Sequence, residues 1–221
     1  MAAQRTLYFA GDIFDHKDLI GNALLADYIE SVSEQRYRCV LPQALEQSTH
    51  RSVAIRNQDL LAVMRSDVAL FNFDGDDLDS GTVVEFMLAK MLDIPAVILR
   101  TDFRSAGDQT KDGDPWNLMC SFYPRTTQVT LNAMAWFQSG RDQDQPVAEA
   151  LEGLYQPLAK EVVSALDEAC AQTPLMSQHL GQATKLYEWA KTFPGSGLPA
   201  ELASGEIDAL IKRKHNAGLI D

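Results

Sequence analysis

Residues 68–92 read VALFNFDGDDLDSGTVVEFMLAKML, and the order of structural elements can be inferred outward from this stretch. Residues 68–72 form an apolar run of strand length, an acidic loop follows, and residues 81–92 have the pattern of a helix that is apolar on nearly every side. Such a helix is typical of a buried position. The stretch therefore predicts one strand–loop–helix unit of a parallel α/β sheet.

The same alternation of strand and helix continues on both sides of this unit. The predicted strands span residues 6–10, 38–41, 68–72, 95–99 and 128–131, and the helices between them span residues 18–33, 53–65 and 81–92. Crossovers between such strands are right-handed and make the strands parallel. We therefore expect an α/β fold with a five-stranded, mostly parallel sheet flanked by helices, of the flavodoxin or Rossmann-like kind.

The C-terminal part of the chain has helical patterns only. Residues 147–171, 176–191 and 207–215 are predicted helices. Upstream of them, residues 101–115 are rich in Gly, Asp, Ser and Thr without an apolar period, and a loop of this length is usually functional or disordered. We expect a catalytic domain over residues 1–143 and a helical extension over residues 144–221.

The composition excludes several classes of function. A net charge of −12 opposes binding to nucleic acid or to anionic membranes. The three cysteines and four histidines show no metal-ligand spacing, so we expect reduced thiols, no metal and no organic cofactor. The sequence has neither a dinucleotide-binding glycine motif, nor a P-loop, nor a serine-hydrolase elbow. Without a signal sequence or an apolar run near ~20 residues, the protein is expected in the cytoplasm.

Two carboxylates at the start of the apolar helix point to a site. Glu85 is the only acid in the first two turns, and a carboxylate there is costly unless it is paired or used. Helical side chains lean toward the N-terminus, which brings Glu85 back toward Asp79. Gly81 lies on the same face and leaves backbone bare for a ligand. Open α/β sheets bind ligands at this end of their strands.

Other polar residues admit two interpretations each. Asp59 lies within an apolar stripe of its helix, where an acid is either a satisfied core residue or a group with a raised pKa. Tyr8 points either into the core or to the carboxyl end of its strand, as a hydrogen-bonding post. Asp79 also suits a helix N-cap, a role compatible with substrate binding. The acids at positions 74, 76 and 77 are expected to form a solvated turn.

Four sequence features occur together in the order typical of one enzyme family. They are Tyr8-Phe9-Ala10-Gly11, Asp59 with Asp67, Asp79-x-Gly81-x-x-x-Glu85, and Asn117-Leu118-Met119. Over residues 5–137 this pattern resembles the nucleoside 2-deoxyribosyltransferases, which move 2-deoxyribose between nucleobases with net retention at the anomeric carbon. Each feature alone would be weak, but the ordered set is specific.

The resemblance implies a role for each matching residue. Glu85 would be the nucleophile, Tyr8 would position it, and Asp59 and Asp79 would contact base and sugar. Further substrate contacts would come from Gly11, Gly81, Asn117, Met119 and Gln43, with Gln47 as an alternative to Gln43. Asn117 and Met119 would enter the site from a neighbouring subunit, so the resemblance implies a homo-oligomer with shared active sites.

The chain departs from the family pattern in its last ~75 residues of predicted helix. The family's terminal carboxylate and last tyrosine, which help to close the pocket, therefore cannot be assigned here. The helices could serve assembly, pocket closure or a partner surface.

The expected chemistry is a double displacement. An ionised carboxylate stabilises the oxocarbenium-like transition state and then traps the sugar covalently, as in retaining glycosidases. Glu85 suits this task, and Asp59 or Asp79 would protonate the departing base. The expected partners are deoxynucleosides and free nucleobases. Two alternatives stay open: an N-glycosidase that hydrolyses deoxynucleoside 5′-monophosphates, and a non-catalytic nucleoside sensor.

Overall fold

A computed structural model describes residues 4–45, 52–110, 112–142, 144–176 and 180–220. Its centre is a fully parallel sheet with the strand order β2-β1-β3-β4-β5. The strands are β1 (Arg5–Ala10), β2 (Tyr37–Val40), β3 (Val68–Asn72), β4 (Ala96–Arg100) and β5 (Thr126–Thr130). The prediction of a five-stranded parallel α/β sheet is confirmed. The strand order reverses between β1 and β3, and open α/β sheets place ligands at such a switch point.

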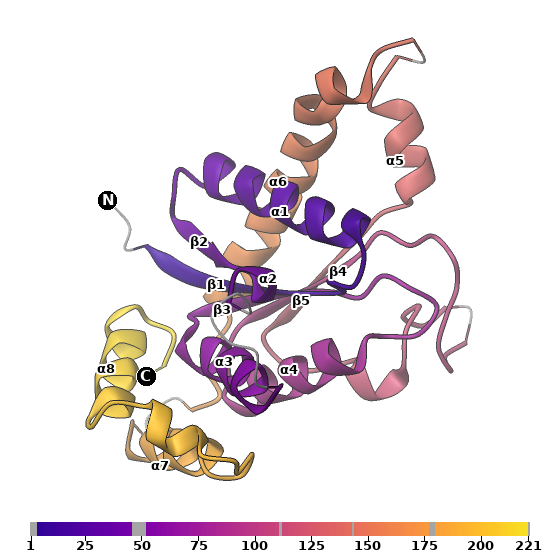
Figure 1. Cartoon of the computed structure of the whole chain (residues 1–221). Helices are drawn as coiled ribbons and strands as arrows, with labels where there is room; N and C mark the ends of the chain where they lie inside the picture. Colours follow the sequence, from indigo (N-terminus) through magenta and orange to yellow (C-terminus); the bar gives the residue numbers. More distant parts are fainter. Residues whose placement is uncertain (1–3, 46–51, 111, 143, 177–179, 221) are drawn as a thin grey trace.

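Helices cover both faces of the sheet (Figure 1). The helices between strands are α1 (His16–Val32), α2 (Pro42–Leu45), α3 (Ser52–Arg65), α4 (Ser80–Met91) and the short 3₁₀ helix η2 (Leu118–Cys120). After β5 come α5 (Ala133–Ser139), α6 (Val147–Ala171), α7 (Leu180–Ala190), the 3₁₀ helix η3 (Leu198–Glu201) and α8 (Glu206–Asn216). The sequence analysis missed α2, α5 and both 3₁₀ helices, which are too short to show a full apolar period.

The alternation of side chains along β1 divides the core into two layers. Leu7 and Phe9 pack with α1 and α6, whereas Tyr8 and Ala10 pack with α3, α4 and the C-terminal helices. Successive side chains of a strand point to opposite faces, so the register of β1 alone places Tyr8 on the face covered by α4.

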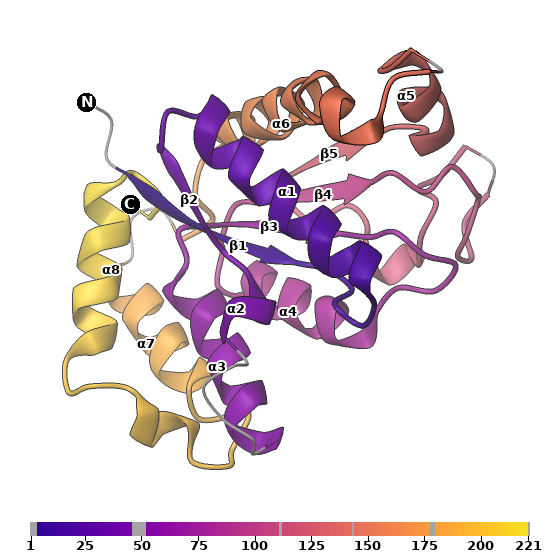
Figure 2. The ribbon, with the colours of Figure 1, turned by 45° about the horizontal axis from the view of Figure 1, so that its top comes forward.

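The C-terminal helices are packed onto the sheet rather than set apart from it. α6 packs against α1, β4 and β5, and α7 and α8 lie beside α3 on the other face (Figure 2). Buried Tyr187 of α7 and Ile211 of α8 share a core cluster with Tyr8. The domain boundary at residue 143 stays a prediction.

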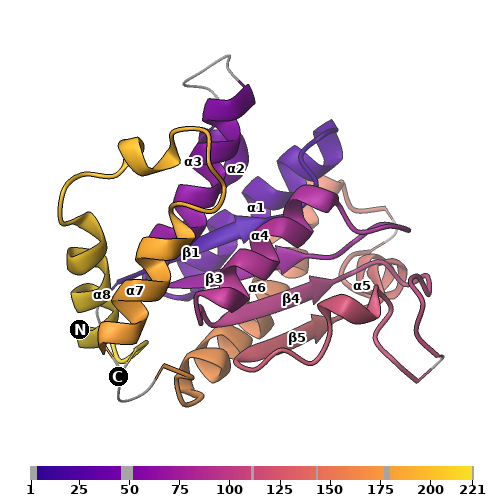
Figure 3. The same ribbon diagram turned by 90° about the horizontal axis from the view of Figure 1, so that it is seen from below.

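The expectation that α4 is buried nearly all round is wrong for its outer face. Val84 and Met87 are 56% and 39% exposed. No described element of this chain covers that side, because the sheet lies beneath α4 and α3 lies beside it (Figure 3). Contact with the sheet therefore explains the apolar residues on the inner face of α4, but it does not explain why Val84 and Met87 are apolar.

A buried cluster of charges ties α8 to the amino edge of the sheet. Lys214 is 2% exposed, its Nζ donates to the Ser66 carbonyl, and it lies 6.0 Å from the centre of the Tyr187 ring. Asp67 accepts hydrogen bonds from the Thr6 amide and the Arg213 guanidinium. Burial lowers the pKa of Lys214 to about 7, and the charge of Asp67 only partly opposes this effect.

Lys214 is expected to make stability depend on pH. Between its folded pKa of about 7 and its unfolded pKa of 10.5, the unfolded chain binds a proton that the folded chain lacks, so the free energy of unfolding rises with pH. Lys214→Met should reduce this rise in the free energy of unfolding by a few kcal/mol, because each unit of difference between the folded and unfolded pKa corresponds to about 1.4 kcal/mol.

Chemical denaturation of the wild type and the variant at pH 7 and pH 10 measures the effect. Lys160→Met, a change at an exposed lysine of α6, is the control. An unchanged pH slope in Lys214→Met would show that Lys214 stays protonated in the folded protein.

Candidate functional site

Tyr8 and Glu85 meet at the carboxyl ends of β1 and β3. The Tyr8 hydroxyl donates a hydrogen bond of 2.7 Å to Oε1 of Glu85. Tyr8 is fully buried, and Glu85 is half-buried in the second turn of α4. The phenol can therefore hold the carboxylate in one orientation while part of Glu85 stays accessible.

An aromatic cluster fixes the helix that carries Glu85. The Phe86 ring packs edge-to-face against Phe71, Phe73 and Tyr123 at centroid distances of 5.2, 5.5 and 5.4 Å. Such contacts add about 0.5–1.5 kcal/mol each beyond the burial of area. Since Phe86 faces the core, the adjacent Glu85 is set at the edge of that core, where β1 presents Tyr8.

Asp79 caps the same helix. Its Oδ2 accepts hydrogen bonds from the amide and hydroxyl of Thr82, at 2.6 and 2.9 Å. A Cβ on Gly81 would lie 3.0 Å from this oxygen, so the glycine leaves room for the cap. Gly81 itself is exposed, and a contact of its backbone with a ligand stays a prediction.

Asp12 is a further acid of the site, and it was not among the residues singled out from the sequence. Burial raises the pKa of Asp12, and the neighbouring charge of Asp79 raises it further. The two carboxylates therefore interact electrostatically across the ends of β1 and β3. Its position after Gly11, at the exit of a strand, was the available signal.

Gly11 serves a close approach between two strand ends. A Cβ at Gly11 would lie 3.0 Å from Cβ of Asn72, which follows from the parallel pairing of β1 and β3. Beside it, buried Asn22 donates from Nδ2 to the Asp12 carbonyl at 2.9 Å. A direct contact of Gly11 with substrate stays a prediction.

The acidic loop after β3 is only partly the solvated turn that was expected. Asp76 and Asp77 are exposed. Asp74, in contrast, accepts hydrogen bonds from the Thr101 amide and hydroxyl and from the Asp102 amide, at 2.5–2.7 Å. The expectation for Asp74 is wrong, because its carboxylate joins the loop after β3 to the loop after β4.

Arg100 strengthens the same junction. It is 1% exposed, and its Nη1 donates to the carbonyls of Phe73 and Gly75. Through these two carbonyls the arginine fixes the path of the acidic loop into α4. An arginine that ends an otherwise apolar strand was the signal for this role.

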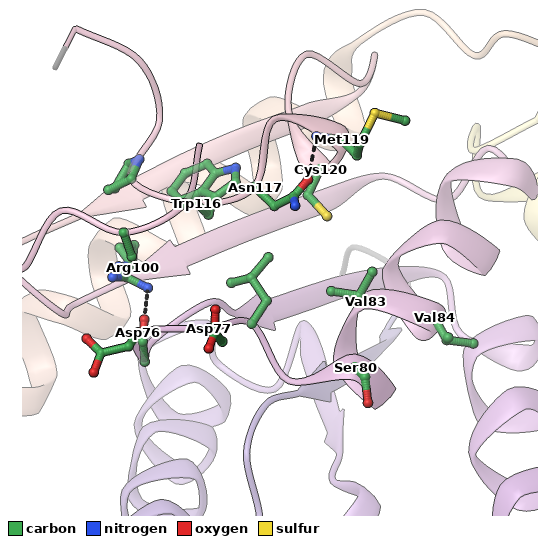
Figure 4. A pocket seen from close by; sticks show the side chains of 15 residues that line it. Asp76, Asp77, Ser80, Val83, Val84, Arg100, Trp116, Asn117, Met119 and Cys120 are labelled. Carbon is green, nitrogen blue, oxygen red and sulfur yellow. Dashed lines mark hydrogen bonds between the residues drawn. The ribbon is translucent and has the colours of Figure 1, made fainter. Parts of the chain in front are cut away.

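Asn117 and Met119 lie on a different hollow from the Tyr8–Glu85 pair. They line a cavity of about 570 Å³ with Val83, Trp116 and Cys120, but Tyr8 and Glu85 do not line it (Figure 4). Asn117 accepts the Met119 amide at its Oδ1, and Met119 is 72% exposed. Within this chain, the cavity that Asn117 and Met119 line therefore does not include the Tyr8–Glu85 pair.

The loop before Asn117 is held within its own chain. Asp108 accepts the Leu118 amide at 2.8 Å, and Gln109 donates to the Trp116 carbonyl at 3.0 Å. This end of the loop is therefore supported by hydrogen bonds within its own chain.

The remaining candidates lie around the same face of the sheet. Asp59 is half-buried on α3, which packs against α4. Gln43 of α2 donates to the Leu19 carbonyl at 2.9 Å, and its buried Oε1 meets no hydrogen-bond donor within the described part of the chain. Gln47 falls outside the described residues.

Neither a metal cluster nor a membrane span occurs in the described ranges. No three His, Cys, Asp or Glu side chains gather there as metal ligands. Helices of sufficient length and apolar character to cross a membrane are also absent from those ranges. The cytoplasmic location stays a prediction.

Sequence comparison gives one family match, which spans half of the chain. Residues 7–119 match the family described as nucleoside 2-deoxyribosyltransferase. The matched region runs from β1 through η2 and contains Tyr8, Asp59, Asp79, Glu85 and Asn117. A comparison with curated proteins gave no match.

Several solved structures are similar to parts of this chain. A conserved protein from Enterococcus faecalis V583 is 24% identical, with 70% of this chain and 99% of that chain covered and a TM-score of 0.49. A 2-desoxiribosyltransferase from Leishmania mexicana is 20% identical, with coverages of 60% and 96% and a TM-score of 0.45. A 2-deoxyribosyltransferase from Bacillus psychrosaccharolyticus is 13% identical, with coverages of 66% and 95% and a TM-score of 0.41.

Proposed function

Because this chain belongs to the nucleoside 2-deoxyribosyltransferase family, we propose that it transfers 2-deoxyribose from a deoxynucleoside to a free nucleobase. The observation that carries the proposal is the 2.7 Å hydrogen bond from the Tyr8 hydroxyl to the Glu85 carboxylate. A carboxylate oriented in this way at the mouth of a parallel sheet suits nucleophilic attack on a sugar carbon.

The proposed reaction has two displacements. In the first, a Glu85 oxygen bonds to the anomeric carbon while the bond to the base breaks, and the bond's electron pair leaves with the base, which takes up a proton. In the second, a nitrogen of the incoming base attacks that carbon, gives up its proton, and the bond to Glu85 breaks. Two inversions give net retention, as in retaining glycosidases. The N-terminal end of α4 favours the ionised form of Glu85.

Asp59 is the proposed proton donor to the departing base, with Asp79 as the alternative. Asp59 is half-buried on α3, beside the apolar core formed by Leu60 and Leu61. A carboxyl in such surroundings holds its proton more readily than one in water, which suits a general acid. Asp79 is engaged in capping α4 through Thr82, so one of its oxygens is already used and we assign it to contact with the sugar instead.

The charges of the site favour a neutral sugar over a phosphorylated one. Asp12 and Asp79 lie close enough for one charge to affect the other. A 5′-phosphate near this pair would be repelled, and phosphate sites need amides or cations instead. This observation favours deoxynucleosides over deoxynucleoside monophosphates as substrates.

Gln43 is proposed to contact the nucleobase. Its amide nitrogen is used by the Leu19 carbonyl, whereas its buried Oε1 is an acceptor that a donor group of a base could satisfy. A buried acceptor without a donor is costly, so a ligand that supplies one gains affinity.

We also propose that active sites are shared between subunits. Asn117 and Met119 line a cavity that includes Val84 but not their own Glu85, and Val84, Leu118 and Met119 are all exposed. An outer face of α4 that is apolar and uncovered by its own chain fits contact with a second copy. Each subunit would then supply Asn117 and Met119 to its neighbour's sugar site.

A two-base exchange assay tests the proposed function. The protein is incubated with deoxyadenosine and a second free base, and products are separated by chromatography. A new deoxynucleoside supports transfer, and free deoxyribose alone identifies a hydrolase. If neither forms, the same incubation with deoxyadenosine 5′-monophosphate distinguishes a monophosphate N-glycosidase, which releases the base, from a non-catalytic sensor, which does not.

Glu85→Ala should lower the rate of base release at least ~10³-fold, because it removes the nucleophile of the first displacement. The fold should persist, since Glu85 is only half-buried. Mass spectrometry of wild-type protein mixed with deoxyadenosine should find the sugar on the peptide that contains Glu85. Sugar on a different residue would assign the nucleophile elsewhere.

Asp59→Asn should lower the release of adenine from deoxyadenosine by ~10²–10⁴-fold through loss of the general acid. The same variant should release 7-methylguanine from 7-methyl-2′-deoxyguanosine at nearly the wild-type rate, because that base already carries a positive charge and needs no proton to leave. Equal losses on both substrates would show that Asp59 does not act as the acid.

Mixing two inactive variants tests the shared site. Glu85→Ala and Asn117→Ala proteins, each inactive alone, should recover part of the wild-type activity when mixed, because some mixed sites contain both intact residues. Sedimentation measures the oligomer in parallel. A fully active monomer would show that each chain holds a complete site.

A further inference from the structure

The segment between α7 and α8 contacts the amino-terminal half of α3, the helix that carries Asp59, and Glu206 at the start of α8 contacts the last residue of α3 (Figure 3). We infer that this segment, residues 194–206, positions Asp59 for the reaction, with Glu201 as the main positioning residue. The inference rests on the proposed function and assigns a positioning role to part of the helical extension.

The contacts in the amino-terminal half of α3 centre on Asn57, two residues before Asp59. Asn57 is 1% exposed, and its Nδ2 donates to Oε1 of Glu201 at 2.8 Å and to the Ser196 carbonyl at 3.2 Å. Arg56 donates from Nη2 to the Pro194 carbonyl at 3.1 Å and to Oδ1 of Asn57 at 2.9 Å. A buried amide whose groups are all engaged allows little rotation of the helix.

The turn that supplies these acceptors is itself a constrained structure. Ser196 has a φ of 53° and stands between Gly195 at 64° and Gly197 at 80°. A left-handed serine costs about 1–3 kcal/mol and persists only where its surroundings determine it. Here the Ser196 carbonyl is bound by Asn57, and the following Leu198 is fully buried in the core cluster that contains Leu60 of α3.

The carboxyl end of α3 is held independently. Arg65 donates from Nε to Oε1 of Glu206 at 2.7 Å, and Arg213 donates from Nη2 to the Arg65 carbonyl at 2.5 Å. Fixing a 14-residue helix in its amino-terminal half and at its last residue sets its rotation about its axis and its shift along it. The direction of the Asp59 carboxyl follows from that rotation.

Position matters for a general acid more than for a binding group. Proton transfer requires the acid within hydrogen-bonding reach of the base nitrogen, and a displacement of 1 Å can cost ~10²-fold in rate. Loss of the Glu201 contact should therefore act on the chemical step through Asp59 and leave the Glu85 carboxylate, which is on α4, in place.

The test compares three variants on two substrates. Glu201→Ala removes an acceptor for Asn57, and Glu201→Gln keeps an acceptor oxygen at the same distance. Glu188→Ala, the control, removes a glutamate of α7 that is paired with Lys191. Release of base is measured from deoxyadenosine and from 7-methyl-2′-deoxyguanosine, because this step is common to transfer and to hydrolysis.

Glu201→Ala is expected to lower kcat for deoxyadenosine about tenfold or more with a smaller change in KM, and to leave turnover of the methylated substrate unchanged. Glu201→Gln should stay within about threefold of the wild type, and Glu188→Ala should equal it. Thermal unfolding of each variant records any loss of stability. The inference would be overturned if Glu201→Ala turned over both substrates at the wild-type rate, or if it lost the same fraction of its rate on both.

A double-variant cycle separates positioning from a general structural effect. In an Asp59→Asn background, Glu201→Ala should cause no further loss, because the group that it positions is already absent. Multiplied losses would show that Glu201 acts independently of Asp59 and would overturn the inference. Base release by the wild type is measured first and tests the proposed function separately. An inactive wild type contradicts the proposed function. An active wild type with unaffected variants contradicts only the positioning role of Glu201.

Discussion

Phe86 packs edge-to-face against two aromatic residues at the end of β3 and against Tyr123, and this contact fixes α4 on the sheet. Glu85 precedes Phe86, so its carboxylate is carried to the rim of the core whenever the ring is seated within it. The strand alternation of β1 brings the Tyr8 hydroxyl to the same rim. A buried ring and a strand register thus determine the position of the most reactive group in the molecule.

Much of the fold followed from periodicity in the sequence. Five short apolar runs and the helices between them predicted a parallel sheet, and the boundaries of α6 agree with the predicted residues 147–171. The surroundings of each element were harder to infer. The apolar face of α4 at Val84 and Met87 is exposed, because a hydrophobic pattern shows that a surface avoids water but not which molecule covers it.

The site was predictable to a different extent. Glu85 could be predicted because an acid in an apolar helix is costly unless it is paired or used. Its pairing with Tyr8 was predicted only from the family resemblance. The structural role of Asp74 could not be inferred, because its partners lie 27 and 28 residues away in the loop after β4. The same holds for Asp12 and Asp79, which affect each other only once β1 and β3 are paired.

The contacts that hold α3 also bear on the order of folding, because they join residues much farther apart in the sequence than those joined by the sheet. Asn57 and Glu201 are 144 residues apart, and Arg65 and Glu206 are 141 residues apart, whereas neighbouring strands join over much shorter segments. Closing a longer loop costs more chain entropy, so contacts of high sequence separation are favoured only after nearer ones have formed. The sheet can therefore assemble before α3 is fastened, and α3 can loosen as a local unit while the strands stay paired.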